Sequence, residues 1–440
     1  MLAGDIVEKL KNRFDAVEVY IEKTVSKEFE LRNSKDFSKG MNIDKGCGIR
    51  AIDNGKLAFI HFSMSNDEKL DIDKISRELS ESAFLVEKID ANSISKIPFK
   101  SQRNKEFDIN DILAKEKIEF MDNIAKSFDK RIVDVKGASV GFFKKEFEIA
   151  NSYGVSAKDE KTHVSASVSV LAKENEVSDS GWYSLDGDSL DSIDFEFVAQ
   201  KAANMAVNKL HPKTASTKKY SIIFANYVFN QILSHFFSAF DGYSVINHTT
   251  PFANKIGERI FSDNITIKDA KSLSFRPNDT LIDDEGSKRQ DTVVVEKGVL
   301  KTFLHNTYTS EKLNQNNTAN AKRASWASLP KVGAFNFYIE GDAAVNRDEL
   351  LNKFDGIYIT EIMGLHMANS ISGDFSFGID GFLTHNGELV SYFKSATLAD
   401  NFFDMMKRVI GLSNSMYFSG SFGSPDIAIA DCVVGGEGYE

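Results

Sequence analysis

Residues 220–242, YSIIFANYVFNQILSHFFSAFDG, place an apolar strand directly before an apolar helix and open the largest segment of the chain. In the second part apolar residues recur at helical spacing, namely Tyr227, Val228, Ile232, Leu233, Phe236, Phe237 and Phe240. Many short apolar runs separated by turns follow as far as residue 434. This pattern predicts a strand-rich domain with a strongly curved antiparallel sheet or a partial barrel.

The chain before this domain mixes helix and strand patterns, so the predicted fold class is α+β. Val17, Val19 and Ile21 alternate with polar or aromatic residues and predict a half-buried strand, and a second strand is expected at Phe29 and Leu31. Breaks near Pro98 and in the polar stretch 211–219 suggest an N-terminal α/β subdomain at 1–98. They also suggest a central helix-and-strand subdomain at 99–215 and a β-rich domain at 220–440.

Several local patterns predict individual elements. Asn-Gly pairs at 54–55 and 386–387 lie between apolar runs and favour tight hairpin turns, because both residues tolerate positive φ. Helices are expected from Asn110, over 195–210 and over 400–412, and a two-faced antiparallel strand is expected over 164–171.

Composition excludes several classes of function. The chain has 440 residues, of which 42% are hydrophobic and 35 are Phe, so it can bury sizeable cores. Its net charge of -11, from 64 acidic and 53 basic residues, argues against nucleic acid as the main partner. No apolar run is long enough to span a bilayer, and no signal peptide is indicated. Cys47 and Cys432 lie far apart in sequence and fit a reduced, cytoplasmic location.

His235 is the first candidate for chemistry. A zinc peptidase helix needs a second imidazole to hold the metal and a carboxylate to take a proton from the metal-bound water. The neighbours at the corresponding positions are Phe236 and Phe240, whose side chains can do neither. A lone His on an apolar helix is more often a core residue than a metal ligand.

Other candidates carry weaker signals. Asp283 and Asp284 begin an acidic cluster that could hold a divalent ion, although its spacing differs from a calcium loop and favours a solvated turn. His366 lies beside glycines at a strand end, where sites often form, but nothing in the sequence pairs with it. Ser hydrolase motifs of the GxSxG type are missing from the sequence, and a metal-independent hydrolase using His366 or His235 is the weakest alternative.

Several longer stretches, taken in order, resemble the TldD/PmbA family, the so-called modulators of DNA gyrase. The resemblance covers nearly the whole chain. The matching stretches are VEVYIEKTVSKEFELRN (17–33), GCGIRAIDNGKLAFIHFS (46–63), LSHFFSAFDG (233–242), LIDDEGSKRQDTVVVEKGVLKTFLHNTYTSEKL (281–313), FNFYIEGD (335–342), GLHMANSISGDFSFGIDGFLTHNGELV (364–390) and DNFFDMMKRVIGLSNSMYF (400–418).

The family has two arms, and the resemblance places this chain with the PmbA or TldE arm. The TldD-like arm carries HExxxH and a downstream Cys as zinc ligands. Here His235 matches the first His, whereas Phe236 replaces the general base and Phe240 the second His. The Cys position should fall near residues 420–423, which contain no Cys. The resemblance therefore implies no catalytic residue and no metal in this chain, with zinc expected in a partner subunit.

The resemblance implies a protease subunit that pairs with a TldD-like metallopeptidase acting on unfolded or peptide substrates. Such substrates include peptide-antibiotic precursors and antitoxins. Proteolysis is then expected only in the pair. The alternative is a stand-alone homodimer that binds peptides or proteins without cutting them. His235, His366, Asp283 and Asp284 are the candidate contacts to a cleft or a partner.

Overall fold

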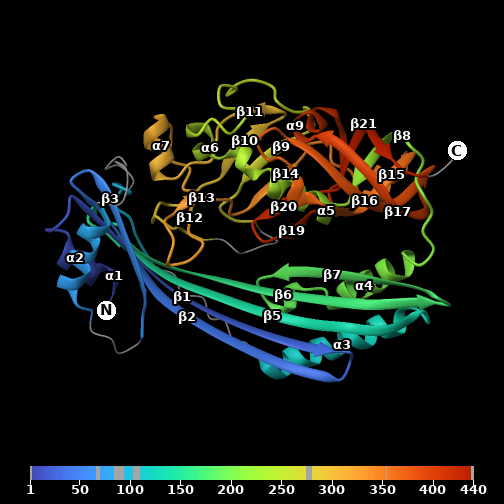
Figure 1. Cartoon of the computed structure of the whole chain (residues 1–440), viewed down its shortest axis with the longest axis horizontal. Helices are drawn as coiled ribbons and strands as arrows, with labels where there is room; N and C mark the ends of the chain where they lie inside the picture. Colours follow the sequence, from blue (N-terminus) through green and yellow to red (C-terminus); the bar gives the residue numbers. More distant parts are fainter. Residues whose placement is uncertain are drawn as a thin grey trace.

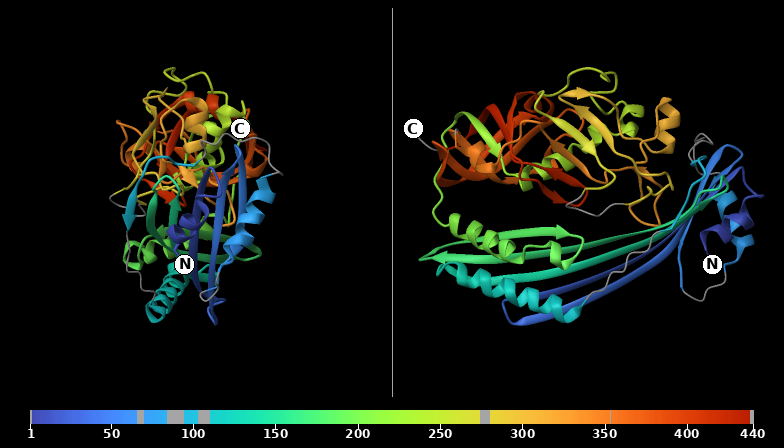
Figure 2. Two further views of the ribbon diagram at one scale, coloured as in Figure 1. Left: turned by 90° about the vertical axis from the view of Figure 1, so that its left-hand side faces the viewer. Right: turned by 180° about the vertical axis from the view of Figure 1, so that it is seen from behind.

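The computed structural model describes residues 2–65, 70–83, 94–102, 110–273, 280–352 and 354–437. A long curved sheet forms one layer, and the strand-rich C-terminal domain lies against it as a second layer (Figure 1). Figure 2 shows the same two layers from the side and from behind. This mixture of helices with largely antiparallel sheets confirms the predicted α+β class.

The long sheet has the strand order β3-β2-β1-β5-β6-β4, and β7 pairs with β6. Its strands are β1 (Ala16–Arg32), β2 (Asp36–Asp53), β3 (Lys56–Ser63), β4 (Lys100–Gln102), β5 (Ile132–Asn151), β6 (Ser156–Glu174) and β7 (Val177–Gly187). Strands before and after residue 98 thus share one sheet. The prediction of separate strands at 17–21 and at Phe29 and Leu31 is wrong, because β1 is paired without interruption to both β2 and β5.

The start of β1 is buried on both faces, so the predicted half-buried strand is also wrong. Val17, Val19 and Ile21 belong to a hydrophobic core shared with helices α1 (Ala3–Leu10) and α2 (Ile72–Ala83). Tyr20, on the opposite face, belongs to a cluster with Ile282 of the C-terminal domain. Glu18 lies on that same face and is paired with arginines, which is why a charged residue is tolerated there.

Two helices cover the other end of the sheet. They are α3 (Asp111–Phe128) and α4 (Phe195–Asn208), and a short 3-10 helix, η1 (Leu190–Ser192), precedes α4. Asn110 caps α3 by accepting hydrogen bonds from the backbone N–H groups of Ile112 and Leu113, as its position in the sequence predicts. Alternate residues of β6, from Val164 to Val170, are buried against these helices. The described part of the chain contains no helix long and apolar enough to cross a membrane.

The C-terminal domain is built around a closed barrel. Five strands, in the order β17-β16-β15-β8-β21, close through pairing of β17 with β21, and β18 adds to β21. The predicted curved sheet or partial barrel is confirmed, and the barrel closes fully. The strands are β8 (Lys218–Phe224), β15 (Gly356–Met363), β16 (Asp374–His385), β17 (Glu388–Asn401), β18 (Val409–Leu412) and β21 (Ile427–Gly435).

A second, six-stranded sheet completes this domain, in the order β11-β10-β9-β14-β20-β19. Its strands are β9 (Thr266–Asp269), β10 (Thr292–Glu296), β11 (Val299–Leu300), β14 (Phe337–Glu340), β19 (Tyr417–Ser419) and β20 (Phe422–Ser424). A separate ribbon pairs β12 (Ala321–Lys322) with β13 (Lys331–Val332).

The remaining helices of the domain are short. They are α5 (Asn226–His235), η2 (Phe237–Phe240), α6 (Gly242–Ile246), α7 (Thr307–Leu313), α8 (Arg347–Leu351), η3 (Leu365–Met367), α9 (Phe402–Met405) and η4 (Met406–Arg408). The helix predicted over 400–412 is partly wrong. Its last part is strand β18, because pairing with β21 outweighs the local helical spacing.

Candidate functional site

Helix α5 carries His235 at its C-terminal end and is held by the segment that precedes β21. Asp426 accepts a hydrogen bond from the backbone N–H of Asn226, at 2.8 Å. The Asn230 side chain donates to the carbonyl oxygen of Phe422, at 2.6 Å. His235 is half-buried, and its Nε2 lies 3.0 Å from the carbonyl oxygen of Ala368. The imidazole therefore already has a neutral protein partner.

Phe236 and Phe240 point into the aromatic core of the domain. Both are 0% exposed. The Phe236 ring stacks on Phe402, with ring centroids 4.2 Å apart and planes 4° apart. Phe240 packs against Phe252, Phe261 and Phe337. Helix α5 ends at His235 and a 3-10 turn follows, so the chain carries these two rings into the core beyond the end of the helix.

The side chains around His235 do not fit a zinc ion. A protein zinc site needs three or four ligands drawn from Cys, His, Asp and Glu. Within the residues that the structure describes, no three such side chains are grouped closely enough to hold a metal. The cavity beside His235 is instead lined by neutral polar groups such as Asn230 and Ser421, by the amine of Lys322, and by the apolar side chains of Leu365 and Phe422.

Asp283 and Asp284 lie in a buried loop and not in the solvated turn that their sequence favours. They are 0% and 5% exposed. Asp283 accepts hydrogen bonds from the backbone N–H groups of Glu285, Ser287 and Ala321, at 2.8–3.0 Å. Burial and the charge of Glu285 raise the pKa of Asp283. Asp284 accepts a hydrogen bond from the backbone N–H of Arg323 at 2.7 Å, so both aspartates are part of the framework of this buried loop.

His366 lies on η3, in the loop whose Ala368 carbonyl bonds His235. Its side chain is exposed, whereas that of His235 is half-buried. Leu365, beside it, lines the cavity next to His235. The structure thus brings His366 and His235 to the same region of the surface and places Asp283 and Asp284 in a different, buried loop.

A buried ionic network joins this loop to the long sheet. Glu18 of β1 accepts from Arg50 at 2.7 and 2.8 Å, and from Arg323 at 2.6 Å. Arg50 also donates to Glu285 at 3.1 Å. All four side chains are at most 3% exposed. Glu18 and Arg50 belong to the long sheet, whereas Glu285 and Arg323 belong to the C-terminal domain. The network therefore fixes the C-terminal domain on the sheet.

His305 is a buried imidazole in the segment between β11 and α7. It is 0% exposed, its Nδ1 lies 3.2 Å from the Thr309 hydroxyl, and its Nε2 has no hydrogen-bond partner among the described residues. Burial lowers the pKa of His305 to about 4. The fold therefore favours the neutral imidazole.

This lowered pKa predicts a loss of stability in acid. The unfolded chain takes up the proton near pH 6.5, but the folded chain does so only near pH 4, so stability falls as the pH drops through this window. We expect His305 to account for about 2 kcal/mol of the loss between pH 7.5 and pH 5. Thermal unfolding of wild type and His305→Gln at both pH values measures this share. An equal acid loss in both proteins would rule it out.

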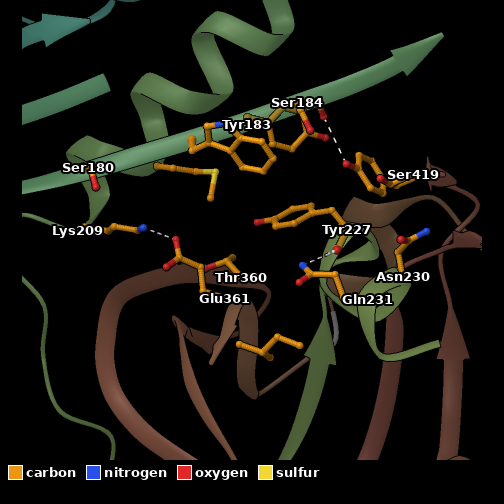
Figure 3. A pocket seen from close by; sticks show the side chains of 14 residues that line it. Ser180, Tyr183, Ser184, Lys209, Tyr227, Asn230, Gln231, Thr360, Glu361 and Ser419 are labelled. Carbon is orange, nitrogen blue, oxygen red and sulfur yellow. Dashed lines mark hydrogen bonds and ion pairs between the residues drawn. The ribbon is translucent and has the colours of Figure 1, made fainter. Parts of the chain in front are cut away.

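An aromatic cavity of 470 Å³ lies between β7, α4 and the C-terminal domain. The Tyr183 and Tyr227 rings line it together and contact each other edge to face, with centroids 5.7 Å apart and planes at 90° (Figure 3). The Tyr227 hydroxyl is buried and has no hydrogen-bond partner among the described residues. Lys209 pairs with Glu361 at one side of the cavity (Figure 3). The cavity thus combines aromatic walls with polar side chains such as Ser180, Thr360 and Ser419.

This aromatic cavity lies beside the one next to His235, because Asn230, Gln231 and Ser419 line both. Sequence reasoning did not single out Tyr183 or Lys322, and it placed Tyr227 only in an apolar helix pattern. They come from β7, β12 and α5, and no local spacing links them. Only the folded arrangement of the sheet and the C-terminal domain brings them to one region.

Three family models match most of the chain. They describe the PmbA/TldA metallopeptidase domain 1, central domain and C-terminal domain, and they match residues 17–83, 107–210 and 217–436. The three matches follow the chain in the order of the family's own domains.

Individual relatives agree with the family models. A protein named Metalloprotease PmbA homolog from Haemophilus influenzae is 27% identical over 66% of this chain and 62% of its own length. A Metalloprotease TldD homolog from Buchnera aphidicola subsp. Acyrthosiphon pisum is 21% identical over 90% of this chain and 85% of its own length. The crystal structure of TldE from Thermococcus kodakarensis shares the fold, with a TM-score of 0.85, 19% identity, and coverage of 98% of this chain and 99% of that one.

Proposed function

The chain belongs to the PmbA/TldD family of metallopeptidase-like proteins, and we propose that it is the non-catalytic, metal-free subunit of a two-chain zinc peptidase. Its partner would be a TldD-like protein that holds the zinc, and the pair would act on unfolded or peptide substrates. The observation that carries this proposal is the burial of Phe236 and Phe240 in the aromatic core. By the resemblance to the TldD-like arm, these rings take the positions of its general base and second metal ligand.

The contacts of both rings support a structural role for this segment. A stacked pair such as Phe236 and Phe402 adds packing energy beyond the area that the rings bury. A carboxylate at position 236 would enter a dry aromatic cluster without a hydrogen-bond partner. Catalysis would need polar side chains at these two positions, but the core needs phenylalanine there.

The aromatic cavity and the adjoining cavity beside His235 support a role in binding peptides. Together they combine aromatic walls from Tyr183 and Tyr227 with polar groups from Asn230 and Gln231. Apolar pockets with a few convergent polar groups are the usual form of a binding site. In the proposed pair this chain would bind and position substrate, while the partner would supply the metal, the base and the thiol.

The loop around His366 supports contact with a partner chain. Met363, Met367 and Ile371 are 49%, 70% and 52% exposed, although such side chains usually lie inside. They flank the exposed His366 and the His235 region. In our proposal this apolar loop forms part of a large interface in the domain after residue 220, of ~2,000 Å² or more, as obligate pairs require.

Co-purification from the native cell tests the proposed partner. A tagged chain isolated from cells that carry both arms of the family should bring down a TldD-like protein in about equal amount, identified by mass spectrometry. A tagged variant with Met367→Asp and Ile371→Asp should retain less of it. Recovery of the chain as a homodimer without any TldD-like protein would favour the stand-alone binding function instead.

The metal-free state is tested by elemental analysis. The purified chain should contain far less than one zinc per molecule, because the His235 imidazole alone cannot hold the ion against water. The His235→Ala variant should contain the same small amount. About one tightly held zinc per chain, lost in His235→Ala, would show that this chain has a metal site of its own.

A further inference from the structure

The cavity beside His235 has a volume of 620 Å³ and contains an amine that the proposed function does not yet use. Its walls come from α5, from Lys322 of β12 and from the 419–422 turn between β19 and β20. Gly420 in this turn has a φ of 58°, and a side chain added there would meet nothing within 4 Å. The cavity is therefore open on the side of this glycine.

Lys322 has only neutral hydrogen-bond partners among the described residues. Its Nζ donates to the carbonyl oxygen of Ala334 at 2.9 Å and to the hydroxyl of Ser421 at 2.7 Å. An ammonium group has three N–H donors, so one remains for a further acceptor. Burial lowers the pKa of Lys322, and the carboxylates of Asp284 and Asp269 partly oppose this.

Those two carboxylates have cations of their own. Asp269 pairs with Arg289 at 2.9 Å, and Asp284 lies 3.6 Å from Lys145. Lys322 therefore has a positive charge in a half-buried position without a dedicated counter-ion in the described part of the chain. A partly desolvated charge of this kind is stabilised by a ligand of opposite sign. The same charge repels a metal cation.

Ser421 adds a second donor beside the amine. It is 7% exposed, lines the cavity, and its hydroxyl oxygen accepts from Lys322, which leaves the hydroxyl hydrogen available. An ammonium and a hydroxyl side by side match the two oxygens of one carboxylate. The neighbouring aromatic cavity would receive an adjacent side chain of the same ligand.

We propose that the cavity beside His235 binds a carboxylate group of a peptide, with Lys322 as its counter-ion and Ser421 as a second hydrogen-bond donor. This inference rests on the proposed peptide-binding role and specifies the chemistry that the peptide must present. The carboxylate could be the C-terminus of the peptide or an acidic side chain, and both sources offer the same two oxygens.

Binding of dye-labelled pentapeptides to the full chain, measured by fluorescence anisotropy, tests the site. Four peptides are compared. Two have only uncharged side chains and end in either a free carboxylate or an amide. The other two end in an amide and contain either Glu or Gln. The free acid should bind about tenfold more tightly than the amide, since a charged hydrogen bond is lost with the amide. If the Glu peptide recovers the affinity and the Gln peptide does not, the cavity also binds the carboxylate of an acidic side chain.

Variants connect this preference to the cavity. Lys322→Met should abolish the difference between acid and amide, and Ser421→Ala should reduce it. Lys255→Met removes the same charge from an exposed lysine outside the cavity and should leave the preference unchanged. If Lys322→Met does not fold, Ser421→Ala and the four peptides on the wild type still decide the matter.

Two outcomes would overturn the carboxylate site. One is equal affinity of the wild type for acid and amide, which would leave a general peptide-binding role intact. The other is a preference that persists in folded Lys322→Met. If no peptide binds, either to the chain alone or to its mixture with a TldD-like protein, both the site and the peptide-binding role are wrong. Failure to pair with such a protein, with acid preference retained, would overturn only the subunit proposal.

Discussion

The double substitution Phe236→Glu and Phe240→His should destabilise the chain severely and should not produce a zinc peptidase. Both rings are fully buried, and Phe236 is stacked on Phe402 at 4.2 Å. Loss of one buried Phe side chain costs about 3–5 kcal/mol, and an unpaired buried carboxylate adds to this. Even a folded variant would lack a third metal ligand near residues 420–423. Thermal unfolding, zinc analysis and a casein cleavage assay measure these effects.

Conservative variants provide the control. Phe236→Leu and Phe240→Leu keep an apolar side chain in the core and should cost much less stability than the Glu and His pair. The variant Phe197→Leu changes an exposed ring on α4 and should have little effect. A stable Glu and His double variant that binds one zinc and cleaves casein would contradict the structural role assigned to these rings.

The substitution Glu18→Gln should be nearly as damaging, although it changes only one atom of the side chain. It removes the negative charge between Arg50 and Arg323, which lie 2.7 and 2.6 Å from Glu18. The side chains of these arginines are at most 3% exposed, so water cannot reach them and solvate their charges in place of Glu18. Breaking a buried ion pair in this way costs about 3–5 kcal/mol. Thermal or denaturant unfolding of the variant provides the measurement.

A second glutamate on the same strand gives the matched comparison. Glu30 pairs with Arg32, which is 66% exposed, and Glu30→Gln should change stability by less than about 1 kcal/mol. Adding Arg323→Met to Glu18→Gln should recover part of the loss, because one uncompensated charge is then removed. Equal, small effects of Glu18→Gln and Glu30→Gln would show that the network does not hold the domain on the sheet.

The turns of this fold could be predicted from the sequence because their cause is local. Asn54 and Gly55 have φ values of 51° and 74°, and Asn386 and Gly387 have values of 48° and 82°. Both pairs connect antiparallel strands as predicted, β2 to β3 and β16 to β17. Asn and Gly tolerate positive φ, so an Asn-Gly pair between two apolar runs is enough to predict the turn.

Strand length and burial could not be predicted because their causes are distant. The polar middle of β1 interrupts the apolar alternation, yet the strand continues because β2 and β5 pair with it on both sides. Glu18 and Asp283 are charged residue types, which usually predict an exposed side chain. They are buried because arginines and backbone N–H groups from elsewhere in the chain satisfy them. The position of Lys322 in a cavity could not be predicted from the sequence, because the walls of that cavity come from separated segments of the chain.

A titration of a TldD-like partner with this chain tests the account most directly. The partner from the same organism is held at fixed concentration, this chain is added stepwise, and the cleavage rate of an unfolded peptide is followed. We predict that neither protein cleaves efficiently alone and that the rate rises until about one chain is present per partner. A partner that is fully active by itself, and whose rate does not change at any ratio, would contradict the proposal that this chain is its subunit.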